Sequence, residues 1–322
     1  MSLFFNGVIF ASTLNYGAIV GIDTLGIPNA TYAVVLMASS LAGAAASVIL
    51  GWLSDRVRDR RLLVVACALT GAIGFGAIYL IRDQLSFILV TCAVMPFAFA
   101  IFSQIMAHAR VHLTAAQPGR ADFMISALRT VFAVAWAIVP PFVGILAAST
   151  SVFEIYAVAA AAFLVIAAIY LVMLWTDRAA WTAGKAGGAR AAPVRPTGME
   201  VDPAIAGGTV GWLLIAVAVQ ITTVTAPLLV TNTLGGGYDQ LGIYAGLAAA
   251  LELPFIILWG YVLRWVKKHT VIIAAAMLYA IYLGLLSQAQ SVADVLWLQL
   301  INGPATAALV SIPISYMQEA IR

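Results

Sequence analysis

Long apolar stretches follow one another along almost the whole chain, separated by short polar or glycine-rich breaks. A helix needs about 20 apolar residues to cross the hydrocarbon core of a bilayer. The stretches are continuous rather than alternating, which favours membrane-spanning helices over the strands of a membrane barrel. The pattern predicts ten spans, at residues 3–22, 31–53, 62–81, 85–107, 123–148, 152–175, 208–231, 240–263, 270–288 and 292–316.

The composition agrees with this pattern. Of the 322 residues, 63% are hydrophobic and only 9% are charged, whereas a soluble domain has about 45–50% apolar and about 25% charged residues. We therefore expect an all-α membrane protein in contact with the lipid bilayer. The sequence lacks the Gly-x-Ser-x-Gly, phosphate-loop and His-Glu-x-x-His motifs. We expect neither an enzyme, nor a cofactor, nor a metal site.

The basic residues predict the orientation of the spans. Fourteen of the 16 Lys and Arg residues fall in or beside alternate connections. Cytoplasmic loops carry an excess of Lys and Arg, so these connections are expected in the cytoplasm of a multi-pass inner-membrane protein. Because the basic residues are dispersed among loops, we expect no nucleic-acid partner.

The longest break predicts two halves. It is rich in Ala, Gly, Pro and Arg, which is typical of a flexible linker. We expect an N-terminal half of six helices at 1–178, a cytoplasmic linker at 179–207, and a C-terminal half of four helices at 208–322. Gly51-Trp52-Leu53 and Gly260-Tyr261-Val262 each precede a basic connection and lie 209 residues apart. Parallel repeats of this kind are typical of membrane transporters.

The basic connection after the second span carries a resemblance. The segment Gly51-Trp52-Leu53-Ser54-Asp55-Arg56, followed by basic residues, resembles the signature loop between helices 2 and 3 of the major facilitator superfamily. The resemblance implies that this loop locks one conformation through charge contacts between helix ends, with Gly51 permitting close helix packing. The residues concerned are Gly51, Asp55, Arg56, Arg60 and Arg61. The alternative is that the loop is only a basic anchor on the cytoplasmic side.

Further segments are similar to the sugar efflux transporter family within that superfamily. They are Ser103–Arg110, Ser126–Arg129, Ala135–Pro141, Leu251–Pro254 and Tyr316–Glu319. The resemblance implies a helical bundle of twelve spans and proton-coupled efflux of a sugar or related small metabolite by alternating access, with the proton as coupling ion. Since only ten spans are found, we expect the C-terminal half to be incomplete. Efflux of drug-like compounds and an inactive truncated transporter remain the alternatives.

Two ionisable side chains stand out because they lie well inside predicted spans rather than at their ends: Arg129 and Glu252. A charge at the centre of a span costs about 2.5–3.5 kcal/mol on insertion scales, so such residues usually face a cavity or a partner. One hypothesis gives Glu252 the coupling proton, while Arg129 binds the substrate or keeps Glu252 ionised. The alternative is a fixed Arg129–Glu252 ion pair that only joins the two halves.

Polar and aromatic residues within the other spans suit a small polar substrate. Amides pair with hydroxyl groups, and an indole ring packs against the C–H surface of a sugar. The residues expected to line the substrate route are Asn15, Gln104, Trp136, Gln220, Gln299 and Asn302. The alternative for each is a hydrogen bond between helices. Pro140 and Pro141 remove two backbone donors and predict a hinge in the fifth span. We expect a monomer.

Overall fold

A computed structural model describes residues 1–57, 59–116, 120–176 and 203–320. The expected linker therefore lies almost entirely outside the described residues, as do the side chains of Asp55 and of Tyr316–Glu319. The regular secondary-structure elements in the described ranges are all helices. Nine helical segments there are long and apolar enough to cross a membrane, and Ser2–Thr13 is a shorter apolar helix. The all-α membrane fold is thereby confirmed.

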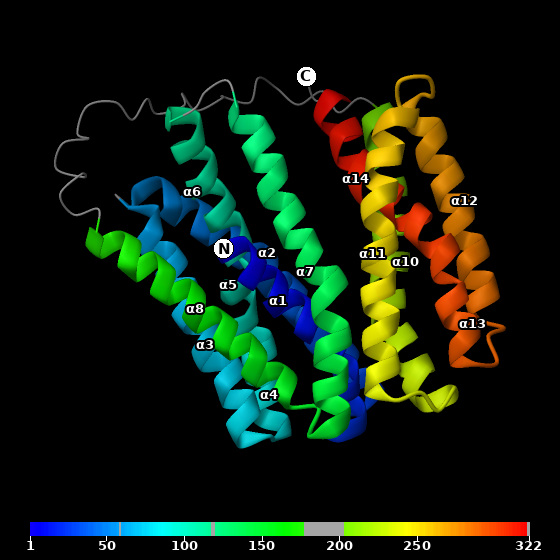
Figure 1. Cartoon of the computed structure of the whole chain (residues 1–322), viewed down its shortest axis with the longest axis horizontal. Coiled ribbons are helices and arrows are strands. Elements are labelled where there is room, and N and C mark those ends of the chain that lie inside the picture. The colour runs from blue at the N-terminus through cyan, green and yellow to red at the C-terminus, as the bar shows by residue number, and fades with distance from the viewer. Residues whose placement is uncertain (58, 117–119, 177–202, 321–322) are drawn as a thin grey trace.

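Figure 1 shows two helical bundles side by side, with α7 and α11 adjacent between them. The N-terminal bundle contains α1 (Ser2–Thr13), η1 (Ile19–Thr24), α2 (Asn29–Arg56), α3 (Arg60–Ile81), α4 (Gln84–Leu89), η2 (Val90–Val94), α5 (Met95–Phe99), α6 (Ile101–Ala116), α7 (Ala121–Ser149) and α8 (Glu154–Thr176). The C-terminal bundle contains α10 (Pro203–Leu228), η4 (Leu229–Thr233), α11 (Tyr238–Val262), α12 (Lys268–Leu286), α13 (Val292–Trp297) and α14 (Gln299–Ala320).

Each bundle buries aromatic and aliphatic side chains inside and exposes further large apolar side chains on its outer surface. Phe75 of α3 is fully buried and stacks on Tyr156 and Phe163 of α8, with ring centroids 5.8 and 5.6 Å apart. α3 and α8 approach each other closely at Gly71, where an added Cβ would lie 2.5 Å from the Phe163 ring. Large apolar residues such as Ile73 and Ile257 are exposed. Lipid is the solvent that suits this outer surface.

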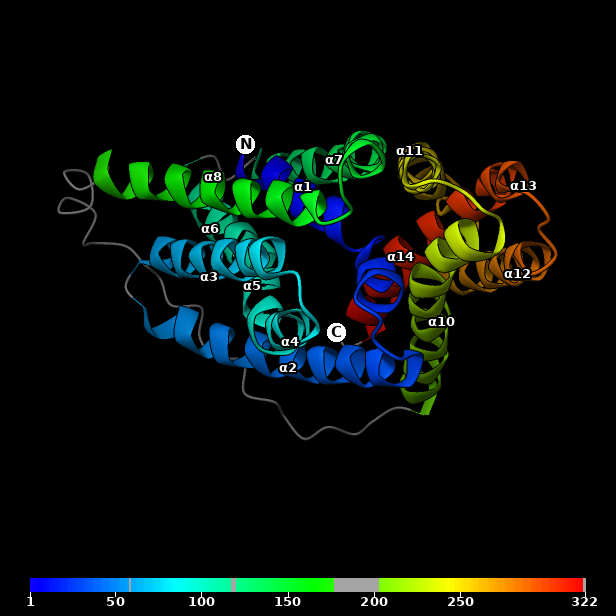
Figure 2. The same ribbon diagram turned by 90° about the horizontal axis from the view of Figure 1, so that it is seen from below.

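The two bundles repeat one another with an offset of 209 residues. Gly26 and Gly235 both have a positive φ, 69° and 67°, which glycine adopts without steric cost. Each follows a π-helical segment, η1 or η4, and each precedes the helix that begins at Asn29 or Tyr238. Figure 2 shows the same two bundles side by side when the molecule is seen from below. The parallel repeat suggested by Gly51 and Gly260 therefore extends to backbone geometry.

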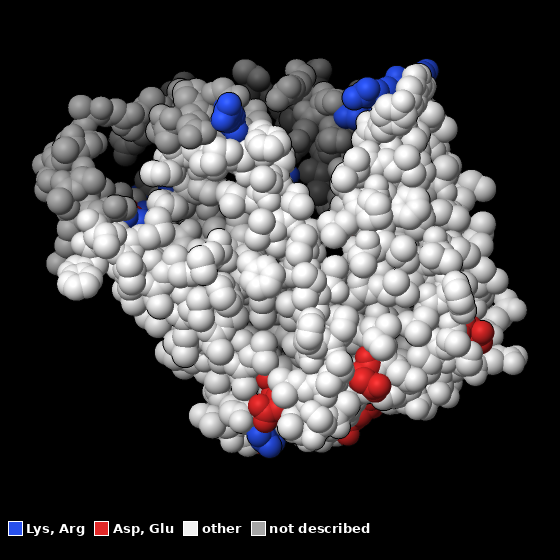
Figure 3. All heavy atoms as spheres, in the orientation of Figure 1, with Lys and Arg blue, Asp and Glu red and all other residues white. Residues whose placement is uncertain are grey.

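The molecule has a basic end and an acidic end. Lys and Arg gather at the upper end in Figure 3, where α2, α6, α8 and α11 finish, while Asp and Glu gather at the lower end. The surface is hollowed between the two bundles at the basic end (Figure 3). At the acidic end the bundles are hydrogen-bonded: the Tyr16 hydroxyl donates to the Tyr238 carbonyl over 3.2 Å, and Asn232 Nδ2 donates to Asp23 Oδ1 over 2.9 Å.

Candidate functional site

A cavity of about 440 Å³ lies between the bundles. Its wall comes from the end of α1 and from α7, α10, α11, α12 and α14. Much of the lining is apolar, including Phe132, Val219 and Ala248. The polar and aromatic lining residues are Asn15, Trp136, Gln220, Thr222, Thr223, Tyr244, Glu252, Tyr279, Asn302 and Thr306. Within the described part of the chain, Glu252 is the one charged residue of this wall.

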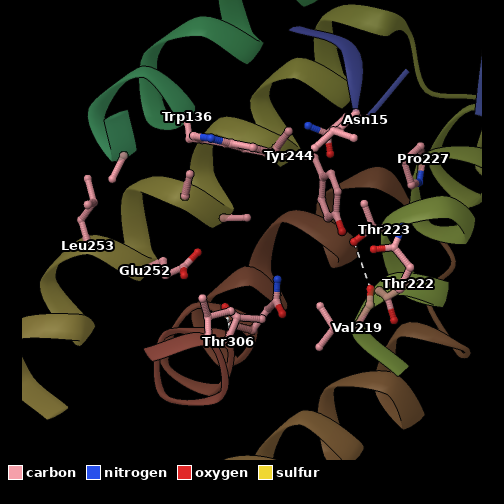
Figure 4. A pocket seen from close by; sticks show the side chains of 18 of the residues that line it. Asn15, Trp136, Val219, Thr222, Thr223, Pro227, Tyr244, Glu252, Leu253 and Thr306 are labelled. Carbon is pink, nitrogen blue, oxygen red and sulfur yellow. Dashed lines mark hydrogen bonds between the residues drawn. The ribbon is translucent and has the colours of Figure 1, made fainter. Parts of the chain in front are cut away.

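Asn15 lies where the first span is interrupted. The expected helix 3–22 is not continuous, because α1 ends at Thr13 and residues 14–16 form a turn before the helix resumes as η1. Asn15 Nδ2 is buried and has no hydrogen-bond partner among the described residues. In Figure 4 the Asn15 side chain points into the cavity from above. The break in the helix therefore leaves an unpaired, buried donor beside the cavity.

Glu252 projects into the cavity from α11, on the side opposite Thr222 and Thr223 of α10 (Figure 4). In the described ranges its carboxylate has neither a hydrogen bond nor an ion pair. Gly303 of α14 allows the close approach of the two helices here, since an added Cβ would lie 2.7 Å from Leu251 Cβ. Glu252 is thus exposed to whatever enters the cavity rather than held by a partner side chain.

Asn302 reaches the same cavity from α14. It is only 8% exposed, and its Nδ2 donates to Gln299 Oε1 over 2.8 Å. Asn302 Oδ1 has no partner among the described residues. Thr306, one turn further along α14, also lines the cavity and donates its hydroxyl to the Asn302 backbone carbonyl over 2.8 Å.

Beside the cavity, α7 packs closely on α11. Gly242 and Gly246 of α11 face Pro140 and Pro141 of α7: an added Cβ on Gly246 would lie 2.7 Å from Pro141 Cδ, and one on Gly242 would clash with the Pro140 carbonyl oxygen. Small residues at such a spacing let helix backbones approach closely in membranes. α7 continues as a helix through both prolines, so their role as a hinge stays a prediction.

A model of the Major Facilitator Superfamily matches residues 1–322, the whole chain. The chain belongs to this superfamily. The crystal structure of the nucleoside transporter NupG has a similar fold, with a TM-score of 0.74 at 14% sequence identity, over 99% of this chain and 80% of that one. The family and the major facilitator-type bundle expected from the loop at Gly51–Arg61 are therefore confirmed, and the chain is a transporter rather than an enzyme.

Two bacterial sugar efflux transporters resemble this chain over most of its length. Sugar efflux transporter C of Escherichia coli K12 is 28% identical over 290 residues, covering 87% of this chain and 70% of that protein. Sugar efflux transporter B of Salmonella typhimurium LT2 is 28% identical over 287 residues, with the same coverage. The similarity to sugar efflux transporters drawn from the short motifs is confirmed by these alignments.

Some of the site residues predicted from the sequence line the cavity, and others do not. Asn15, Trp136, Gln220, Glu252 and Asn302 line it together. Gln104 and Gln299 do not: both are buried in helix packing, 5% and 0% exposed.

Arg129 also lies outside the cavity, on the exposed surface of α7. It is seven residues before Trp136, about 10 Å nearer the basic end along the helix. The described residues contain no Arg129–Glu252 ion pair. The hypothesis of a fixed pair joining the halves is therefore wrong for this conformation.

Several cavity residues were not anticipated, namely Thr222, Thr223, Tyr244, Tyr279 and Thr306. Helical spacing contained the signal for some of them. Tyr244 is eight residues before Glu252, and Thr306 is four residues after Asn302, so each pair shares a helix face. Thr222 and Thr223 follow Gln220 by two and three residues. Tyr279 has no such neighbour on α12, and only the tertiary packing brings it to the cavity.

The superfamily signature loop is tied to its own bundle. Arg61 is buried, forms an ion pair with Asp59 at 2.8 Å, and donates from Nη1 to the Met173 carbonyl on α8 over 3.1 Å. The Arg56 guanidinium stacks on the Trp52 ring, 3.5 Å from its centroid. The expected packing role of Gly51 is wrong, because an added Cβ there would meet no described atom within 4 Å. Asp59, which was not among the expected loop residues, caps the start of α3 by accepting a hydrogen bond from the Arg61 backbone N–H.

Proposed function

We propose that this transporter carries a sugar or a related small neutral metabolite out of the cell by alternating access, in exchange for protons. The observation that carries the proposal is the lining of the cavity: amides, hydroxyls and an indole surround one carboxylate, and no Lys or Arg is found among the described lining residues. Such groups suit a polyhydroxy solute, because amides and hydroxyls pair with its hydroxyl groups and the Trp136 ring packs on its C–H face. The named relatives are sugar efflux transporters.

The direction of opening supports alternating access. The hollow between the bundles lies at the basic end, whereas at the acidic end the bundles are joined by hydrogen bonds, and α7 packs closely on α11. By the positive-inside rule the basic end is cytoplasmic, which corresponds to a state ready to take up a solute from inside the cell. Rocking of the two repeats would then open the acidic end to the outside.

Glu252 is our candidate for the proton carrier. Carboxylates within membrane spans mark proton relays in pumps and transporters. In the described residues nothing neutralises Glu252, so its proton is free to exchange with the compartment that the cavity faces. Arg129 lies outside the cavity on the side of the basic end, so we give it no part in binding the proton.

The test uses the purified chain in proteoliposomes containing a pH-sensitive dye. When glucose or lactose is added to proteoliposomes that hold a pH gradient, the dye should report proton movement for the wild type and none for Glu252→Gln. Glu154→Gln, which changes a carboxyl at the start of α8 away from the cavity, should behave like the wild type. Undiminished coupling in Glu252→Gln would remove Glu252 from the mechanism. Proton movement with tetraphenylphosphonium but not with sugars would instead favour efflux of drug-like compounds.

A further inference from the structure

Two neighbouring amide side chains on α14, Gln299 and Asn302, are buried at the edge of the cavity. Gln299 and Asn302 lie one turn apart on α14. Gln299 is fully buried and outside the cavity, whereas Asn302 lines it. The two side chains are joined by a hydrogen bond of 2.8 Å from Asn302 Nδ2 to Gln299 Oε1. Gln299 therefore touches the group that faces the cavity without reaching the cavity itself.

The direction of the hydrogen bonds in this pair is set by the backbone. The Val295 carbonyl lies 2.9 Å from the Gln299 amide, and a backbone carbonyl can only accept. The Gln299 NH₂ group must therefore face Val295, which leaves Oε1 to face Asn302. Because Oε1 can only accept as well, Asn302 must turn its NH₂ group towards Gln299 and its Oδ1 away. This oxygen is buried and has no partner among the described residues.

We propose that Gln299 is a positioning residue that makes Asn302 present a hydrogen-bond acceptor to the cavity, so that the solute must supply a donor there. The inference rests on the proposed function and refines it: a hydroxyl group satisfies the site, whereas an ether, a fluorine or a carbonyl at the same place does not. Leaving a buried acceptor unpaired costs more than the average hydrogen bond contributes. Discrimination therefore comes from the unsatisfied oxygen when a solute lacks the donor.

The first experiment measures the need for a donor. Binding of glucose and of each of its monodeoxyfluoro derivatives is compared in detergent, since fluorine replaces a hydroxyl group without being able to donate. In the wild type, fluorination at one position should weaken binding about tenfold. In Gln299→Met the Asn302 amide is free to turn over and offer its NH₂ group, so this penalty should fall to about twofold. An unchanged penalty in Gln299→Met overturns the proposal.

Two further variants make the result specific. Adding Asn302→Asp to Gln299→Met should restore the penalty, because both carboxylate oxygens accept whichever way the group turns. Gln104→Met removes another buried glutamine, on α6 and outside the cavity, and should leave the penalty at its wild-type value. A reduced penalty in Gln104→Met as well would show a general loosening of the bundle and count against a positioning role.

The second experiment needs no sugar. With ¹⁵N-labelled asparagine, the Asn302 side-chain signal is identified by its loss in Asn302→Asp, and the exchange of its amide protons with water is measured. Exchange should be slow in the wild type and at least about tenfold faster in Gln299→Met, or in Gln299→Leu where the methionine variant does not fold. Equal rates overturn the proposal. Faster exchange combined with no sugar binding in the wild type would instead reject the sugar as solute and leave the acceptor assignment standing.

Discussion

Asp23 and Asn232 occupy equivalent positions in the two repeats, 209 residues apart, and their side chains meet at the acidic end through a hydrogen bond of 2.9 Å. Each lies within a π-helical segment, η1 or η4. Equivalent residues can touch only on the pseudo-symmetry axis that relates the halves. The bond therefore crosses the line along which the acidic end must part when the transporter opens to the other side.

Breaking this bond should favour the state that is open at the acidic end. In Asn232→Ala the carboxylate of Asp23 loses its donor, and we expect the population with separated acidic ends to rise about two- to fivefold, since both side chains are exposed and the bond is worth little more than an average one. Spin labels on Thr24 and Thr233 report the separation by pulsed electron resonance. An unaltered distance distribution would show that the bond plays no part in closure.

The pseudo-symmetry supplies the control. Asn232→Asp alone places two carboxylates against each other and should open the acidic end further than Asn232→Ala. Combining it with Asp23→Asn exchanges the two residues between equivalent positions, so the hydrogen bond should form again and the distances should return to those of the wild type.

The contact between α7 and α11 should be intolerant of even one added methyl group. In Gly242→Ala the new Cβ would overlap the Pro140 carbonyl oxygen, so we expect a loss of about 1–3 kcal/mol in stability. Thermal unfolding in detergent measures this loss. Gly260→Ala on the same helix meets no described atom within 4 Å, and its unfolding midpoint should stay the same or rise slightly. Equal midpoints for the two variants would contradict the close approach.

Gly303 should matter for transport more than for folding. In Gly303→Ala the added Cβ would lie 2.7 Å from Leu251 Cβ, beside Glu252. We expect α14 to move away from α11, displacing Asn302 relative to Glu252 and lowering the affinity for the transported solute about tenfold. The measurement is solute binding alongside thermal unfolding. Gly284→Ala, on α12 and in open space, is the matched substitution and should bind as the wild type does.

The ion pair in the signature loop should make stability depend on pH. Burial raises the pKa of Asp59, but hydrogen bonds from the side chain and backbone of Arg61 outweigh it and hold the pKa below its ordinary value of 3.8. The stabilisation is therefore complete above pH 3.8 and lost as the pH falls through the lower folded value. Asp59→Ser keeps a capping oxygen without a charge. It should lose about 0.5 kcal/mol at pH 7, a value reduced for solvent screening, and the difference from the wild type should vanish near pH 2. A constant difference from pH 7 to pH 2 would mean that the charge contributes nothing.

The spans could be read from the sequence because their determinants are local. Apolar length and the turn residues alone predicted the helices at 62–81 and 240–263, which the structure gives as Arg60–Ile81 and Tyr238–Val262. The break at Asn15 was not predicted, since Leu14-Asn15-Tyr16 contains neither proline nor glycine and lies within a run long enough to span. Its turn depends on packing against the other bundle, where Tyr16 reaches Tyr238.

The site could be read only in part, for a physical reason. The cost of placing Glu252 in a membrane span marked it from the sequence, and the structure brings it to the cavity. The same energetic cost singled out Arg129 in the sequence. Arg129, however, lies nearer the basic end of the bundle, and its side chain is exposed at the surface instead of lining the cavity. Gln299 and Asn302 looked equivalent as amides, and only the rotation of α14 turns one to the cavity and the other to the core.

The scarcity of positive charge around Glu252 has a cellular consequence. A phosphorylated metabolite would bring its own anionic group next to that carboxylate, and the described wall offers no guanidinium or ammonium to offset the repulsion. Kinase products would therefore stay in the cytoplasm while their unphosphorylated precursors leave. Under the proposed activity, the protein would relieve an excess of free sugar without draining the pool already committed to metabolism.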